Sequence, residues 1–235
     1  MTFERLLDAI YPRCCHLCGS RTLSPTNLCT GCLCDLPWIQ HACISCGLPL
    51  AHALRCGACQ RSRSAFSRTI AALRYARPVD RLVHAMKYRY RLDAATTLGQ
   101  ILAAYIQERG AARPECLIPV PLHRKRLRER GFNQALELSL TVASCLDIPV
   151  DYRSVIRCVD TKPQAELNMA QRRRNVRGAF QVQRPVASRH VAIVDDVMTS
   201  GNTCESLAKA LLATGVRRID VWVVARASRD QPNHS

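Results

Sequence analysis

Residues 191–203 of this chain read Val-Ala-Ile-Val-Asp-Asp-Val-Met-Thr-Ser-Gly-Asn-Thr, and this stretch decides the fold. Its first four residues are apolar and predict a short strand buried in a parallel sheet. We expect the strand to end at two adjacent carboxylates, Asp195 and Asp196. After a turn of small residues, leucines at helical spacing predict a helix that closes at Gly215. The turn consists of Thr199, Ser200, Gly201, Asn202 and Thr203.

The turn between this strand and this helix predicts a phosphate site. The backbone N–H groups of such a loop converge on one concavity, and the helix dipole adds partial positive charge there. Asp195 and Asp196 would repel a phosphate, but they are suited to accept hydrogen bonds from sugar hydroxyls or to hold Mg²⁺. The pattern therefore favours a phosphorylated sugar. The alternative is an ordinary turn of a parallel sheet with two solvated aspartates.

Two other phosphate-binding patterns are excluded, because no Lys follows the glycine at P-loop spacing and Gly-x-Gly-x-x-Gly is absent. The stretch instead resembles the phosphoribosyl-pyrophosphate (PRPP) motif of type I phosphoribosyltransferases. That resemblance implies that Asp195 and Asp196 contact the ribose 2′ and 3′ hydroxyls and that residues 199–203 wrap the 5′-phosphate. It also implies that Mg²⁺ accompanies PRPP.

Ten of the 14 cysteines precede residue 60, and eight of them form four Cys-x-x-Cys pairs. Two such pairs complete a tetrahedral Cys₄ zinc site, so we expect two structural Zn²⁺ ions. A glycine follows the first and third pairs, which favours joining pair one to pair two and pair three to pair four. A cross-braced pairing stays open. The predicted ligands are Cys15, Cys18, Cys29, Cys32, Cys43, Cys46, Cys56 and Cys59.

The alternatives for these cysteines are a disulfide framework and a redox Cys-x-x-Cys motif. The N-terminus makes a poor signal peptide, which argues against disulfides, and four pairs in series argue against a redox motif. Cys14 and Cys34 are left over. The segment has few apolar residues, so bound metal would supply its folding energy.

Two strongly basic segments lie downstream. Residues 122–131, after an apolar strand over 116–120, hold five Arg or Lys side chains. Loops at the carboxyl ends of parallel strands meet the ligand, so we expect this cationic loop, with Arg126 and Arg130, to face the pyrophosphate half of PRPP. A solvated face is the alternative. The second segment, residues 167–177, is predicted to be helical, and its alternatives are a nucleic-acid contact or a solvated helix face.

The remaining pattern alternates strands and helices. Strands are expected over 69–75, 150–159 and 219–225, with helices over 78–88 and from a cap at Asp93 to Glu108. The predicted fold class is α/β, a parallel-rich sheet flanked by helices, with a small N-terminal Cys₄ zinc-ribbon module. The predicted divisions are a double zinc ribbon at 1–60, a linker at 61–67, a phosphoribosyltransferase-like domain at 68–228 and a tail at 229–235.

The composition restricts the class of protein. The 235 residues include 34 basic and 18 acidic side chains, for a net charge of +16. This charge favours polyanionic partners such as nucleic acid, nucleotides or pyrophosphates. No apolar run approaches the ~18 residues of a membrane span. We therefore expect a cytoplasmic protein without a membrane span.

Several motifs together resemble the ComF family, the ComFC/GntX-type bacterial competence proteins. The resemblance implies a type I phosphoribosyltransferase fold, PRPP as a ligand, a role in handling incoming DNA, and single-stranded DNA and other DNA-uptake proteins as partners. The alternative function is a non-catalytic single-stranded nucleic-acid-binding factor on the same fold. Besides the cysteine pairs and the PRPP motif, the segments are Pro119-Val120-Pro121-Leu122, Arg130-Gly131-Phe132-Asn133-Gln134, Thr161-x-x-Gln164-x-x-Leu167, Arg172-x-x-Asn175 and Ala179-Phe180.

Overall fold

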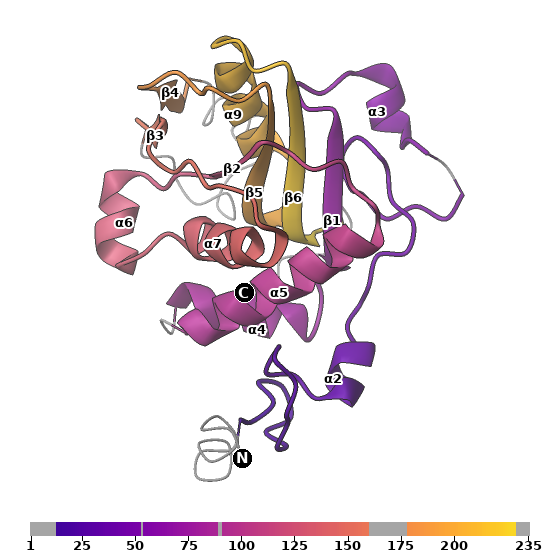
Figure 1. Cartoon of the computed structure of the whole chain (residues 1–235). Coiled ribbons are helices and arrows are strands. Elements are labelled where there is room, and N and C mark those ends of the chain that lie inside the picture. The colour runs from indigo at the N-terminus through magenta and orange to yellow at the C-terminus, as the bar shows by residue number, and fades with distance from the viewer. Residues whose placement is uncertain (1–12, 53, 89–90, 160–177, 229–235) are drawn as a thin grey trace.

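The computed structural model describes residues 13–52, 54–88, 91–159 and 178–228. Its centre is a four-stranded, wholly parallel sheet in the order β1-β6-β5-β2 (Figure 1). Because both faces are covered, the strands are almost continuously apolar. Their bounds are β1 Arg68–Arg74, β2 Cys116–Pro119, β5 His190–Met198 and β6 Arg218–Arg226.

Helices cover both faces of this sheet (Figure 1). Alternate residues of a strand point to opposite faces. Ala192 and Val194 accordingly pack in one core cluster, with α4, α5 and α7. Val191 and Ile193 pack in the other, with α9. The helices are α4 Val79–Tyr88, α5 Leu92–Glu108, α7 Gln134–Leu146 and α9 Asn202–Leu212.

Strand β5 is longer than its sequence predicts, so the expected end at Asp195 is wrong. It continues through both carboxylates because β6 pairs with it as far as Met198. On its other side, β2 pairs with it only to Val194, opposite Pro119. The last residues of β5, including Asp195 and Asp196, therefore project beyond β2 with one strand neighbour.

Two further expectations are corrected. The basic segment is a short helix, α6 Arg124–Arg130, rather than a loop, because the His123 side chain caps its start and Gly131 ends it with φ 75°. The strand expected over 150–159 is only β3 Val155–Arg157, paired antiparallel with β4 Phe180–Val182. The Asp151 carboxylate accepts hydrogen bonds from the N–H groups of Arg153 and Ser154, and this turn interrupts the strand.

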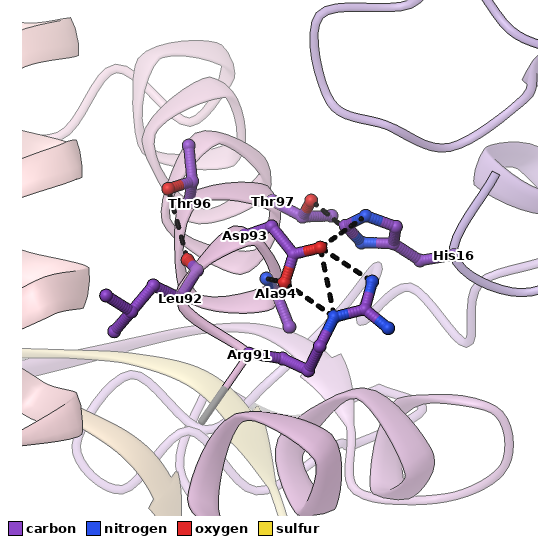
Figure 2. Close-up of polar contacts among 7 residues, drawn as sticks. All are labelled: His16, Arg91, Leu92, Asp93, Ala94, Thr96 and Thr97. Atoms are coloured by element: carbon purple, nitrogen blue, oxygen red, sulfur yellow. Dashed lines mark hydrogen bonds and ion pairs between the residues drawn. The ribbon is translucent and has the colours of Figure 1, made fainter. Parts of the chain in front are cut away.

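The start of α5 is also corrected. Arg91, not Asp93, is the N-cap residue, and Asp93 lies within the first turn. The Asp93 carboxylate accepts hydrogen bonds from the Arg91 guanidinium and pairs with His16 of the N-terminal module (Figure 2). The side chain that the sequence assigns to a cap is therefore held by the neighbouring Arg91 and by a tertiary partner.

The described part of the N-terminal module includes the short helices α2 Thr30–Cys34 and α3 Gly57–Arg61, and it covers the free edge of β1 (Figure 1). The N–H of Ile39 donates to the carbonyl of Ala72 at 3.0 Å, and the N–H of Thr69 donates to the carbonyl of Ile44 at 2.9 Å. An exposed strand edge invites unwanted pairing, and the module removes that risk.

Some expectations lie outside the described residues: the basic segment over 167–177, the motif residues from Thr161 to Asn175, and the tail at 229–235. The domain boundaries at residues 60, 67 and 228 stay predictions. None of the helices in the described parts of the chain is long and apolar enough to cross a membrane.

Candidate functional site

The two carboxylates lie near the carboxyl end of β5 and point to opposite faces of the sheet. Asp196 is 4% exposed, and its Oδ2 pairs with Nζ of Lys87 from α4 at 2.5 Å. Its Oδ1 accepts a hydrogen bond from the N–H of Val197 at 2.8 Å. Asp195 is half-buried, and its Oδ1 accepts from the N–H of Asp196 at 2.9 Å. Both side chains thus belong to the part of β5 that extends beyond its pairing with β2.

The electrostatics of this cluster separate the roles of its members. Burial, followed by the neighbouring charge of Asp196, raises the pKa of Asp195 to about 8. Burial alone would lower the pKa of Lys87, but the adjacent Asp196 carboxylate raises it above its ordinary value. Lys87 and Asp196 therefore form a charged pair, while Asp195 keeps its proton up to neutral pH. A partly exposed, protonated carboxyl can both donate and accept hydrogen bonds to a sugar.

The loop from Thr199 to Thr203 follows directly and leads into α9. Gly201 is the N-cap residue of α9, with φ 79°, in the left-handed region that favours glycine. A Cβ at this position would lie 2.6 Å from Cε of Met198. Beyond it, the first N–H groups of α9 have no partner within the helix. The turn thus combines a tight backbone with a helix N-terminus, as a phosphate site requires.

The predicted arginines belong to α6, whose end meets α4. The Arg130 guanidinium lies over the Tyr88 ring at 5.6 Å and donates to Oε1 of Gln134 at 2.8 Å. Tyr88 directly follows Lys87 in α4, so Arg130 contacts the end of the helix that carries Lys87. Arg126, half-buried, precedes Arg130 by one turn and lies on the same side of α6.

Two residues of this region were missed by sequence reasoning. The apolar stripe of α4 comprises Val79, Leu82, Val83 and Met86. Lys87 continues that spacing, and a cation on a buried stripe signals a buried partner. Arg226 ends the apolar strand β6 and is 3% exposed. A cation at the end of a buried strand likewise indicates a buried partner.

The eight predicted cysteine ligands form two groups, and the Sγ atoms of each group lie within 4.8 Å of one another. Four sulfurs bound tetrahedrally to zinc would be about 3.8 Å apart. Cys18 and Cys29 are separated by 3.7 Å and Cys46 and Cys56 by 3.8 Å. The sequential pairing is confirmed, and the donor sets fit zinc. The first site is Cys15, Cys18, Cys29 and Cys32, and the second is Cys43, Cys46, Cys56 and Cys59.

The backbone around the second site favours thiolate. Burial alone would raise the pKa of Cys43, but N–H groups of Cys56, Cys46 and Ser45 lower it to about 7. The N–H of Cys56 donates to Sγ of Cys43 at 3.3 Å. Since the thiolate is the metal-binding form, this environment prepares the site for a cation.

The chain was compared with solved structures. It is similar to the glutamine PRPP amidotransferase from B. subtilis, with 20% identity, 55% of this chain and 25% of that chain covered, and a TM-score of 0.37. It is also similar to the purine phosphoribosyltransferase from Pyrococcus horikoshii, with 16% identity, 61% of this chain and 87% of that chain covered, and a TM-score of 0.35. These similarities are too low to assign a ligand.

Sequence comparisons are more decisive. Residues 6–60 match the double zinc ribbon domain family. The chain is 33% identical to DNA utilization protein YhgH of Escherichia coli O157:H7 over 221 residues, covering 92% of this chain and 97% of that protein. It is 34% identical to competence protein F of Haemophilus influenzae over 228 residues, with the same coverage. The chain therefore belongs to the ComF family, that of DNA utilization protein YhgH and competence protein F.

Proposed function

We propose that this protein binds PRPP at the carboxyl edge of its parallel sheet and acts as a phosphoribosyltransferase-like protein in the use of DNA. One observation carries the proposal. The Asp195–Asp196 carboxylates lie near the carboxyl end of β5, which leads directly into the loop at Thr199–Thr203. Lys87 of α4 pairs with Asp196, and Arg130 of α6 contacts the next residue of α4. Groups that donate hydrogen bonds to phosphate, together with carboxylates that accept them from sugar hydroxyls, suit a sugar that is phosphorylated at two positions.

Each part has a role in this proposal. The 5′-phosphate accepts hydrogen bonds from the N–H groups at the start of α9, and the loop hydroxyls complete its shell. Asp195 and Asp196 accept the ribose 2′ and 3′ hydroxyls and thereby fix the ring. Arg126 and Arg130 bind the pyrophosphate. Positioning and placed charge are then the protein's main contribution to cleavage of the bond between ribose and pyrophosphate.

The residues also fit a magnesium complex of the ligand. Carboxylate oxygens are the donors that Mg²⁺ prefers, and Lys87 already places a cation against Asp196 at 2.5 Å. Asp195 and Asp196 would help to hold Mg²⁺, which would neutralise charge that develops on the leaving group. The acceptor of the phosphoribosyl group is not specified by these residues.

Titration calorimetry tests the proposal. We expect saturable binding of PRPP by the zinc-loaded protein in the presence of Mg²⁺, and binding at least about tenfold weaker after Mg²⁺ is withdrawn, because the pyrophosphate charge is then uncompensated. Asp147→Asn is a control variant that should bind PRPP as the wild type does, since Asp147 is a fully exposed carboxylate at the end of α7. Absence of PRPP heat in the wild type and the control alike would refute the proposal.

A second candidate function, binding of single-stranded DNA, is supported by α6. Arg124, Lys125 and Arg128 are exposed on this helix, and the net charge is +16. Cationic surfaces of this kind bind the phosphate backbone without sequence preference. The relative named DNA utilization protein gives the candidate a biological context.

This candidate predicts a steep salt dependence. The affinity for a single-stranded oligonucleotide is expected to fall as salt rises from about 50 to about 300 mM, because bound counterions are released on binding. Neutralising Arg124, Lys125 and Arg128 together should make the slope of log K against log salt shallower by about 2, at about 0.7 per phosphate contact. Fluorescence anisotropy measures both. A flat salt profile contradicts DNA binding.

A further inference from the structure

Arg226 connects the second Cys₄ site with the loop proposed to hold phosphate. It is the last residue of β6 and is 3% exposed. Its Nε donates a hydrogen bond to the backbone carbonyl of Cys46 at 2.8 Å. Its Nη1 donates to the carbonyls of Met198, at 2.9 Å, and Thr199. One guanidinium therefore holds a zinc-ligand residue and the first residues of the loop together.

The charge of Arg226 points to the metal site as its counterion. Among the described residues, its hydrogen bonds go to four carbonyl oxygens and none goes to a carboxylate. A buried cation is costly unless opposite charge lies near it. A Zn²⁺ ion with four thiolates carries a net charge of −2, so a loaded second site supplies that charge.

The second site is also pressed against the sheet. Oγ1 of Thr69 in β1 donates to the carbonyl of Ser45 at 2.7 Å. Gly47 has φ 68°, and a Cβ there would lie 2.8 Å from Cγ2 of Thr69. In addition, the N–H of Ala65 donates to Oε2 of Glu205 in α9 at 2.9 Å. These contacts therefore pack the second Cys₄ site and the segment after it against β1, β6 and α9.

The first Cys₄ site is attached elsewhere and serves as an internal control. Its His16 contacts α5, where Nε2 lies 3.2 Å from Oδ2 of Asp93 and Nδ1 lies 3.4 Å from Oγ1 of Thr97 (Figure 2). Cys15 and Leu28 pack in the same core cluster as α4 and α5. Each site has four cysteine ligands of its own, but the two sites contact different parts of the sheet domain.

We propose that metal in the second Cys₄ site positions the phosphate loop through Arg226, so that this site, and not the first, controls the loop. Arg226 is thus a positioning residue. Its effect on PRPP affinity rests on the proposed function, whereas its effect on the loop does not. Loss of the second metal removes the counter-charge of Arg226 and releases the carbonyls of Met198 and Thr199.

The loop carries its own reporter. Met198 is one of four methionines, and its methyl group lies against Gly201. Full-length protein labelled with ¹³C at the methionine methyl groups gives few NMR signals, and Met198→Leu assigns the relevant one. We expect Cys59→Ser, which disables the second site, to shift or broaden the Met198 signal. Cys32→Ser, which disables the first, should leave it unchanged although it also removes one zinc per chain.

Arg226 variants keep the test decisive if Cys59→Ser fails to fold. Arg226→Leu, which adds no methionine signal, should retain both zinc ions, move the Met198 signal and weaken PRPP binding more than tenfold. Arg226→Lys should partly restore the signal and the binding. An unchanged Met198 signal in Cys59→Ser or Arg226→Leu overturns the proposal. So does an equal response in Cys32→Ser. A moved signal without PRPP binding in any variant, including the wild type, refutes the proposed ligand but leaves the coupling established.

Discussion

Asparagine in place of Asp195 is expected to reduce PRPP binding by at least about 100-fold and, at the same time, to make the folded protein more stable at neutral and alkaline pH. The loss follows because an amide cannot ionise. When the proposed ligand arrives with Mg²⁺, Asp195 can give up its proton and supply a carboxylate oxygen, whereas asparagine cannot, and losing a charged partner costs a few kcal/mol. The fold should survive, since the amide oxygen of asparagine can still accept the N–H of Asp196.

The stability gain has a defined pH window. The pKa of Asp195 is raised to about 8 in the folded protein, by burial first and by Asp196 second. Such a group favours the folded state at low pH, and this contribution is lost as pH rises from the ordinary carboxyl pKa through about 8. Asparagine does not titrate, so the variant escapes the loss.

Thermal unfolding of the ligand-free protein at about pH 5, 7 and 8.5 measures the effect. The melting temperature of Asp195→Asn minus that of the wild type should increase across the series. Asp147→Asn, at an exposed carboxylate, should follow the wild type throughout. Parallel curves for Asp195→Asn and the wild type would show that Asp195 ionises normally.

Removal of zinc is expected to destabilise the whole molecule, not only its N-terminal module. The module has few buried apolar residues, among them Leu28, Leu36 and Ile39. Structural zinc supplies about 10–16 kcal/mol in zinc-finger peptides. Without it, the free edge of β1 loses its cover at Ala72 and Thr69 and becomes available for aggregation.

The measurement is metal analysis combined with calorimetric unfolding. We expect two zinc ions per chain in freshly purified protein. We also expect a fall in melting temperature of at least about 10 °C after stripping with a thiol reagent and a chelator, because about 2–4 °C corresponds to 1 kcal/mol in a chain of this size. Restored thiols and added zinc should reverse the change. Zinc-free protein that unfolds at the same temperature would exclude a structural role for these cysteines.

The sequence predicts the local features of this molecule well. Each Cys-x-x-Cys pair lies on one tight turn, so spacing alone indicates the ligand sets, and the glycines after Cys18 and Cys46 favour the pairing that the structure has. The turn at Gly201 and the helix behind it follow from neighbouring residues in the same way. These features depend on interactions between residues close in the chain.

What the sequence does not predict depends on distant neighbours. Strand β5 extends past Asp195 because β6 pairs with it there, and no property of residues 195–198 contains that information. Asp93 also pairs with His16, a contact between residues far apart in the chain that neither segment predicts by itself. The role of Arg226 likewise requires Cys46 and Met198 to meet at the end of the sheet.

The pair between Lys87 and Asp196 has a consequence for selectivity. The ammonium group of Lys87 is part of α4 and lies 2.5 Å from the Asp196 carboxylate. It therefore competes, at a high effective concentration, with any ligand for that carboxylate. A free cation or a lone sugar hydroxyl must displace it and gains little. A ligand that brings its own cation and anchors itself through two phosphate groups offsets this displacement. Under the proposed function, we therefore expect the complete ligand to bind more tightly than its separate parts.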